Sequence, residues 1–211
     1  MLGVNTVKNL ALSTAAIEQL SGSAASGLDI LEFWRHSLCV GVSSKLLAKK
    51  RGINPLMVEE YFIAGFLHDI GKIPINAVLL KDYTTTITIA EREKKPLYEA
   101  EKNTLGLDHC TAGAMVAASW KLTGAVEDTI MYHNECWEYK GDHKDILYTV
   151  VAANHLASNA GIGFSGNSHP VELPPFICET LDITRDHLTE IEEDVNSDIE
   201  KAEAFLKISL M

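Results

Sequence analysis

One segment constrains the fold of this chain more than any other: an apolar helical stripe that ends in His68-Asp69. Its apolar side chains recur at helical spacing, which predicts a helix with one buried face. A carboxylate at the end of a buried helix is costly unless it is paired or bound to a cation. The doublet therefore predicts a divalent metal ion inside the protein. The stripe consists of Met57, Tyr61, Ala64 and Leu67, widened by Val58 and Phe62.

Helix start signals are frequent along the chain and predict an all-α fold. Asp29 followed by Glu32 is a capping-box pattern. Asn54-Pro55 places an N-cap residue before a proline at the first helical position. The predicted helices span residues 30–50, 55–68, 96–105, 109–122, 125–135, 145–160 and 184–208.

Two stretches do not follow this pattern directly. Residues 84–89 form a β-branched run, which favours a strand by propensity, but no second strand is evident to pair with it. We predict that this run is helical because tertiary packing overrides propensity. A loop rich in Gly, Ser and Pro at residues 161–175 precedes an acidic C-terminal helix. The chain is expected to form one domain over residues 1–211.

Amino-acid composition limits which classes of protein and which kinds of binding partner are compatible with this chain. The 211 residues, 46% of them hydrophobic, are sufficient for a proper core. The formal net charge is −11, and residues 181–211 hold 9 acidic against 3 basic side chains, which argues against a nucleic-acid partner. Neither a signal peptide nor a membrane span is expected. Four cysteines without a C-x-x-C pair indicate reduced thiols and a cytoplasmic protein: Cys39, Cys110, Cys136 and Cys178.

Other candidate ligands lie on the predicted helices or at their ends. His36 follows Glu32 by one turn, so both side chains lie on one helix face. His109 begins a helix, His133 ends one, and Asn154 lies within the helix over residues 145–160. Together with the His-Asp doublet, these residues are the candidate metal ligands.

These residues resemble the pattern of the HD superfamily of metal-dependent phosphohydrolases, which is a histidine, a His-Asp doublet and a distant aspartate. His36, His68 and Asp69 match it, whereas Asn154 stands where the superfamily has its aspartate. A closer resemblance is to the HDOD group, the HD-related output domains of bacterial signalling proteins, and it implies an HD-domain-like helical bundle. It covers nearly the whole chain and rests on residues 2–12, 33–37 and 67–72, and on residues 106–109 leading into Gly113-Ala114 and Trp120.

Members of the HDOD group usually carry several more helices before the segment that residues 2–12 resemble. The resemblance therefore implies that this chain corresponds to the later part of such a domain and lacks its start. An exposed apolar surface near residues 1–20 would be one consequence.

The related HD-GYP phosphodiesterases, which cleave cyclic di-GMP, add ligands at positions that resemble Glu32, His109 and a His-His pair. In this chain the pair reads His133-Asn134, and no Gly-Tyr-Pro follows. The signature for cyclic di-GMP specificity is therefore absent.

The resemblance implies metal-assisted phosphoester hydrolysis as the chemistry of such a site. Asp69 would bridge two divalent ions, and Lys72 would neutralise a phosphate oxygen, so these two are the candidate catalytic residues. Mixed imidazole and carboxylate ligation suits iron, manganese, zinc or nickel better than calcium. The implied metal ligands are His36, His68, Asp69, His109, His133, Asn154 and Glu32.

Ordinary structural roles compete with these assignments. A capping box alone explains Glu32. Lys72 and His133 could be side chains that interact favourably with the negative end of a helix dipole, at the helix C-terminus. His109 could simply be the residue that follows an N-cap. The amide of Asn154 carries no charge, so it weakens both cation binding and water activation compared with a carboxylate.

Two main functions remain open from the sequence. The first is a signal-transduction output domain of HDOD type that retains a metal site and acts through signalling proteins or a small nucleotide. The second is an active metal-dependent phosphohydrolase or phosphodiesterase that acts on a nucleotide or cyclic dinucleotide. A third, a di-iron redox or oxygen sensor, predicts a visible spectrum that changes on reduction. Catalysis and homo-oligomer formation are both left open.

Overall fold

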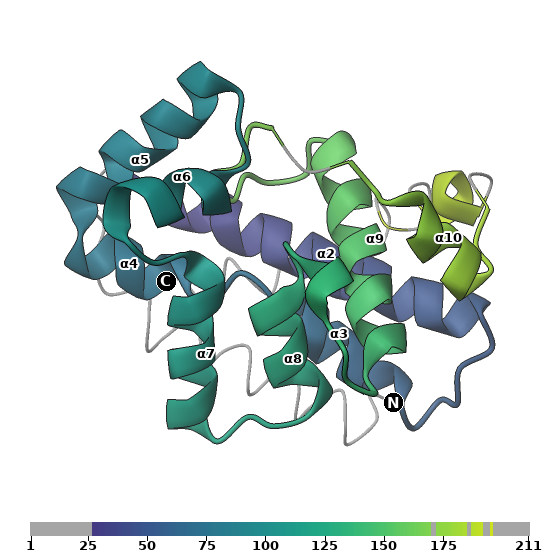
Figure 1. The fold of residues 1–211 in the computed structure, drawn as a ribbon. Helices are drawn as coiled ribbons and strands as arrows, with labels where there is room; N and C mark the ends of the chain where they lie inside the picture. Colours follow the sequence, from purple (N-terminus) through teal and green to yellow (C-terminus); the bar gives the residue numbers. More distant parts are fainter. Residues whose placement is uncertain (1–26, 170–171, 185–186, 192–194, 196–211) are drawn as a thin grey trace.

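The computed structural model describes residues 27–169, 172–184, 187–191 and 195, and these contain helices but no strand (Figure 1). The all-α prediction is therefore confirmed. The helices are α2 (Ile30–Lys50), α3 (Val58–Leu67), α4 (Lys72–Val78), α5 (Leu80–Glu93), α6 (Leu97–Leu105), α7 (His109–Trp120), α8 (Ala125–Tyr132), the short 3-10 helix η1 (Cys136–Glu138), α9 (Lys144–Asn159) and α10 (Pro175–Leu181).

The long helix α2 is the central element, and it packs against α3 and α9 (Figure 1). It begins and ends as predicted, and the Asp29 carboxylate accepts a hydrogen bond from the Glu32 backbone N–H at 3.1 Å. Trp34 on its buried face stacks on Phe66 of α3 with ring centroids 5.3 Å apart. These large aromatic side chains fix the position of α3 on α2.

Helix α3 begins later than predicted. The Asn54 side chain accepts a hydrogen bond from the Leu56 N–H at 3.0 Å, so Asn54-Pro55 forms a turn and α3 starts at Val58. Asparagine side chains compete in this way with the first hydrogen bonds of a helix. The prediction for Met57 is wrong, because this side chain is 48% exposed. The rest of the predicted stripe is buried or partly buried: Val58, Tyr61, Phe62, Ala64 and Leu67.

The β-branched run at residues 84–89 lies within helix α5, as predicted. Its threonine hydroxyls bond along the helix, as Thr86 does to the Asp82 carbonyl at 2.8 Å. Tyr83 and Ala90 of the same helix pack with Leu97 of α6 in a second, smaller core. Burial of this face against α6 explains why packing overrides the β propensity of the run.

Several other helix ends differ from the prediction. Helix α7 ends at Trp120, because Lys121 has a left-handed backbone with φ 56°, and α8 ends at Tyr132. Helices α4 and α10 were not predicted, since seven residues are too few for apolar periodicity to be recognised. The predicted helix over residues 184–208 lies largely, and the predicted surface near residues 1–20 wholly, outside the described residues.

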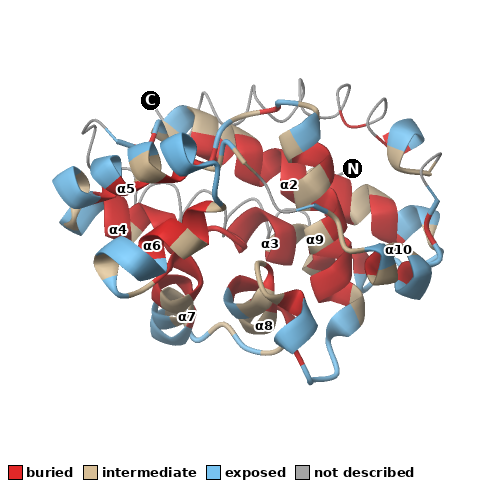
Figure 2. Cartoon of the chain, turned by 45° about the horizontal axis from the view of Figure 1, so that its top comes forward, coloured by how far each residue is buried: buried red, intermediate tan, exposed pale blue. Residues whose placement is uncertain are grey.

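The main core lies between α2, α3, α8 and α9, whose inward faces are buried (red in Figure 2). The turn that follows Asp69 approaches the start of α7 very closely. A Cβ atom on Gly71 would lie 2.0 Å from the His109 carbonyl oxygen and 2.4 Å from the Gly113 nitrogen. Only glycine permits this approach, which brings the His-Asp doublet next to His109.

No helix within the described part of the chain combines the length and the apolar character needed to cross a membrane.

Candidate metal centre

Seven of the predicted site side chains meet in the interior, and they come from separate parts of the fold. Helix α2 supplies His36, α9 supplies Asn154, and α7 and the end of α8 supply His109 and His133. The turn between α3 and α4 supplies the doublet, and Lys72 is the first residue of α4. All but Asn154, which is partly buried, are 4% exposed or less: His36, His68, Asp69, Lys72, His109 and His133.

Asp69 lies at the centre of this cluster, and its two oxygens face different partners. The Oδ2 atom is 2.7 Å from Lys72 Nζ and 3.4 Å from His68 Nε2. The Oδ1 atom is 3.3 Å from His109 Nε2 and 3.4 Å from His133 Nε2. The carboxylate therefore divides the cluster into two halves and faces both, as a bridging ligand would.

The first half consists of His36, His68 and Asp69, whose ligand atoms lie within 4.8 Å of one another. The His68 Nδ1–H donates to the Gly65 carbonyl at 2.7 Å, which turns Nε2 toward the centre. This Nε2 atom is buried and has no hydrogen-bond partner among the described residues. An unpartnered nitrogen beside a carboxylate and a second imidazole fits a divalent cation.

The protonation states of the first half also suit a cation. Burial and the neighbouring His68 lower the pKa of His36 to about 3, so this imidazole is neutral. Burial likewise lowers the pKa of His68. Burial by itself would raise the pKa of Asp69, but His68 and the Lys72 ammonium hold it well below the usual range. Neutral imidazoles and an ionised carboxylate are the forms that bind metals.

Asn154 joins this half through His36. Its Oδ1 atom lies 3.1 Å from His36 Nε2. The structure thus places Asn154 where the resemblance located the fourth ligand position. The contact uses a neutral amide, so the half carries one carboxylate and not two.

The second half consists of His109 and His133, and second contacts orient both rings. His109 Nδ1 lies 2.5 Å from Glu101 Oε2, and His133 Nδ1 lies 3.1 Å from the Ile130 carbonyl oxygen. Both Nε2 atoms consequently face Asp69. Such second contacts commonly fix metal-binding histidines.

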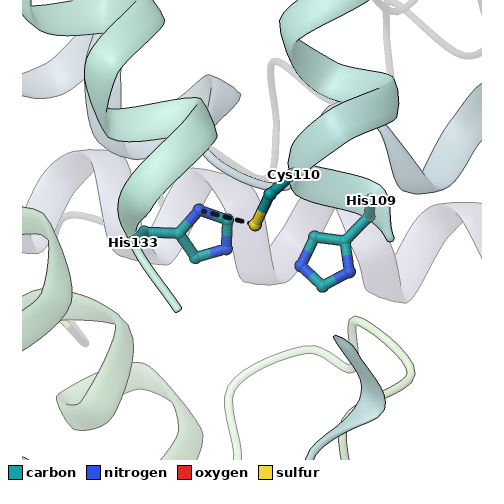
Figure 3. Close-up of side chains that lie close together, drawn as sticks. All are labelled: His109, Cys110 and His133. Carbon is teal, nitrogen blue, oxygen red and sulfur yellow. Dashed lines mark hydrogen bonds between the residues drawn. The ribbon is translucent and has the colours of Figure 1, made fainter. Parts of the chain in front are cut away.

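Two further side chains enter the second half. Cys110 Sγ lies between the two rings (Figure 3), 3.8 Å from His133 Nδ1. Asn134 Nδ2 lies 2.8 Å from His109 Nε2 and 2.9 Å from His133 Nε2. Cys110, His109 and His133 form a second group whose ligand atoms lie within 4.8 Å of one another.

Negative charge around the second half favours protons on its histidines. Burial opposes protonation, but the Glu101 carboxylate raises the pKa of His109 to about 9. Against the same opposition, Cys110 and Asp69 raise the pKa of His133 to about 10. Burial would raise the pKa of Cys110, but the two histidines lower it to about 6. Protons and a cation therefore compete for the same imidazole nitrogens.

Lys72 is held by a loop as well as by Asp69. Its Nζ atom lies 3.2 Å from Ser165 Oγ, and the neighbouring Phe164 N–H donates to the Glu32 carbonyl at 3.0 Å. The loop over residues 161–169 therefore covers the first half. Lys72 begins α4 and is buried, so it is not a solvent-facing lysine at a helix C-terminus.

Glu32 is the one predicted ligand that the structure does not bring into the cluster. The side chain is 35% exposed and pairs with Arg35 at 3.8 Å. Among the described residues, neither group of clustered ligand atoms includes it. Its backbone N–H is bound by the Asp29 cap, which is the ordinary role that competed with ligation.

A cavity of about 30 Å³ borders the cluster at His133, Asn134 and Asn154. Trp137 and Glu172 contribute to its wall. A cavity of this size holds about one water molecule. This cavity therefore has room for a water ligand beside His133 and Asn154.

Sequence reasoning missed four residues that contact the site. Glu101 and Ser165 carry no motif, and only the fold brings them near His109 and Lys72. Cys110 was interpreted only as a reduced thiol, although its position directly after His109 was a usable signal. Asn134 was noted as a missing histidine and not as a side chain with contacts of its own.

The helical fold and the His-Asp centre define a domain of the HD type. The chain belongs to the HDOD domain family, whose model matches residues 1–136.

The chain is similar to an uncharacterized protein of Treponema pallidum (strain Nichols), with 24% identity over 153 residues. That match covers 72% of this chain and 29% of the relative, so the chain spans less than a third of that protein's length.

Two solved structures share the fold. An HDOD domain protein with unknown function from Geobacter sulfurreducens has a TM-score of 0.76 and 27% identity, covering 96% of this chain and 70% of its own. A candidate signal transduction protein from Marinobacter aquaeolei VT8 has a TM-score of 0.81 and 19% identity, covering 98% of this chain and 46% of its own. At the latter identity the likeness shows the fold alone.

Proposed function

We propose that this chain is a signal-transduction output domain that binds one divalent cation at His36, His68 and Asp69 and does not turn over a substrate. The observation that carries the proposal is the buried His68 Nε2 atom, which has no hydrogen-bond partner within the described part of the chain. An ion at this position would satisfy His68, and it would add a second positive charge beside Asp69.

The ligand set favours a bound ion that does not catalyse hydrolysis. Asn154 provides an amide where a second carboxylate would add charge, so a bound water is less activated. The ion then acts by holding together the helices that supply its ligands.

The signalling part of the proposal involves contact with another protein of a signalling pathway or with a small nucleotide. Membership of the HDOD family supports it. The structurally similar protein from Marinobacter aquaeolei, which is described as a signal transduction protein, also supports this role. Exposed apolar side chains on α4 and α7, Val78 at 79% and Met115 at 69%, provide surface of the kind that proteins use for contact.

Metal analysis of the purified full chain tests the proposal. We expect one ion of iron, manganese, zinc or nickel per chain, lost in His68→Ala and retained in His143→Ala. His143 is a suitable control because its side chain is 44% exposed and pairs with Asp128. A wild-type protein that takes up none of these ions after dialysis against them would contradict the proposal.

The alternative function is a metal-dependent phosphohydrolase or phosphodiesterase with a nucleotide or cyclic dinucleotide substrate. One observation favours it: Asp69 faces both halves of the cluster, as the bridging ligand of a two-ion site does. Assays with a generic phosphodiester and with nucleotides decide between the two. Metal-dependent turnover in the wild type that Asp69→Asn abolishes and His143→Ala preserves would establish the alternative.

A further inference from the structure

We propose that the apolar groove between α4 and α7 binds an amphipathic helix of a partner protein, with Asp and Glu side chains bordering the apolar face of that helix. The groove has a volume of about 500 Å³, and none of the candidate metal ligands lines it. The inference rests on the proposed signalling function, for which it names the class of partner.

The groove lies over the seam between the two hydrophobic cores. Helices α4 and α7 pack against one another and form its walls (Figure 1). Ile75 of α4 and Ala112 of α7 belong to the smaller core. Val116 and Trp120 of α7 pack against the main core. Both cores therefore fix the floor of the groove, as expected of a binding surface that is already formed without its partner.

Large apolar side chains remain exposed along this groove. Val78 of α4 and Met115 of α7 both line it, and they are 79% and 69% exposed. Methionine is flexible and polarizable, and it is common at surfaces that bind partners. Exposed apolar side chains above a packed floor therefore indicate a surface that the apolar face of a partner covers.

Both walls of the groove are helices, which limits the shape of the partner. Backbone groups within a helix are already hydrogen-bonded, so an extended strand cannot pair with them and a partner must bind through side chains. From Ala112 to Trp120 the α7 wall extends about 12 Å at about 1.5 Å per residue. Side chains at positions i, i+3, i+4 and i+7 of a partner helix cover a similar length, about 10 Å. The groove therefore fits the apolar face of an amphipathic helix.

Charge around the groove is opposite in sign to that of the whole chain, which carries −11. The segments that form its walls, residues 73–81 and 109–126, contain no Asp or Glu, and their lysines are Lys81 and Lys121. Both lysines are exposed, and neither has an ion-pair partner among the described residues. Asp82, the next residue after Lys81, lies about 100° round α5 from it. Positive charge beside an apolar surface complements a partner with acidic side chains.

A second copy of this chain fits the groove less well. In a symmetric contact the lysines beside one groove would meet those beside the other, because the wall segments contain no acidic side chain. An acidic helix of another protein meets the opposite charge there. The overall negative charge of the chain opposes this helix only weakly, since salt at physiological concentration screens charges beyond about 8 Å.

Binding of two designed helical peptides to the full chain tests the proposal. Both carry leucine at positions i, i+3, i+4 and i+7, and the bordering positions are glutamate in one peptide and lysine in the other. Fluorescence anisotropy should show the acidic peptide binding about tenfold more tightly. Attraction to the net charge of the chain favours the basic peptide, so this order reports the groove. Equal or tighter binding of the basic peptide would overturn the proposal.

Substitutions locate the bound peptide. Met115→Glu should abolish binding of the acidic peptide, and Leu56→Glu should not, since Leu56 is 77% exposed but lies outside the groove. Lys121→Asn should weaken binding by about threefold. Lys94→Asn is the control, because both lysines end helices with a left-handed backbone, which asparagine tolerates. Binding that survives Met115→Glu would place the peptide elsewhere and contradict the proposal.

Oxidation of Met115 in the wild-type chain identifies what covers the groove. Dilute hydrogen peroxide should convert the exposed thioether to the sulfoxide, and the acidic peptide should protect it. Met131 of α8, which is 38% exposed, is the control that the peptide should not protect. Protection in the dilute free chain would mean that a segment of the same chain fills the groove. Protection that increases with protein concentration would mean a second copy, and either result would overturn the proposal.

The metal content of the same samples separates this inference from the one-ion function. A chain that binds the acidic peptide but takes up no ion contradicts the ion site alone. A chain that holds one ion but fails to bind the peptide contradicts the groove alone.

Discussion

Lys72 Nζ lies 2.7 Å from Asp69 Oδ2, and both side chains are buried. The two residues are three positions apart, across the turn that joins α3 to α4. The ammonium therefore supplies positive charge to Asp69 when no ion is bound. This explains how the carboxylate can remain ionised inside the protein.

Lys72→Ala should destabilise the chelator-treated protein by about 3–5 kcal/mol, because it breaks the buried Lys72–Asp69 ion pair and leaves only imidazoles to offset the charge of Asp69. Urea unfolding followed by circular dichroism measures this loss. Lys45→Ala is the matched control, since Lys45 forms a partly exposed 2.7 Å pair with Glu59 and should lose about 0–1 kcal/mol. Equal losses in both variants would show that Asp69 is neutral or hydrated.

Asn154→Asp should tighten divalent-ion binding at the first half by about 10–100-fold, because it adds a carboxylate beside His36. Competition with a fluorescent chelator measures the dissociation constant. Asn159→Asp on the same helix should leave affinity unchanged, since its side chain is exposed. Unchanged affinity in Asn154→Asp would mean that residue 154 does not face the ion.

The stability of the chelator-treated protein should peak near pH 6.5. The pKa of His36 falls from about 6.5 in the unfolded chain to about 3, so the unfolded chain takes up the proton first and stability declines below pH 6.5. The pKa values of His109 and His133 rise to about 9 and about 10, so their contribution is lost as the pH increases from 6.5 through 10.

Urea midpoints at a series of pH values measure this profile. His36→Gln should make the decline on the acid side less steep, since His68 still contributes to it, and should leave the alkaline side unchanged. A wild-type profile that stays flat from pH 7 to about 9.5 would contradict the raised pKa values of His109 and His133.

Glu101→Gln should destabilise the protein by about 1–3 kcal/mol, because Glu101 Oε2 accepts from both the backbone N–H and Nδ1 of His109. A glutamine oxygen is a weaker acceptor than a carboxylate oxygen, and its NH₂ would face the Tyr83 hydroxyl, which donates to Glu101 Oε1 at 2.8 Å and would have to reverse its direction. Thermal unfolding checks the loss. Glu99→Gln, on the same helix but only partly buried, should have little effect.

Most of the helical architecture could be predicted from the sequence, because capping residues and apolar spacing act within a few residues of one another. The predicted range of α2 agrees with the structure, and the Asp29 cap forms as its pattern indicates. Where the prediction failed, a local alternative intervened. The Asn54 side chain closes a turn at the point where α3 was expected to begin.

The site was predicted in part, and the two kinds of outcome have different causes. His68 and Asp69 are adjacent in sequence, so the sequence alone predicts that they lie together. Glu32 matched a pattern equally well, yet its side chain is directed toward Arg35. Helical spacing places Glu32 and His36 on the same face of α2. It does not determine whether both ends of that face contact the core.

The sequence by itself determined that the chain is helical and that an imidazole-carboxylate doublet ends a buried helix. Only the tertiary structure decided that Asp69 faces two groups of donors, and that Cys110 and Asn134 belong to the second group. The physical reason is distance along the chain. Helix signals act over one or two turns, whereas these contacts depend on packing between α3, α7 and α8.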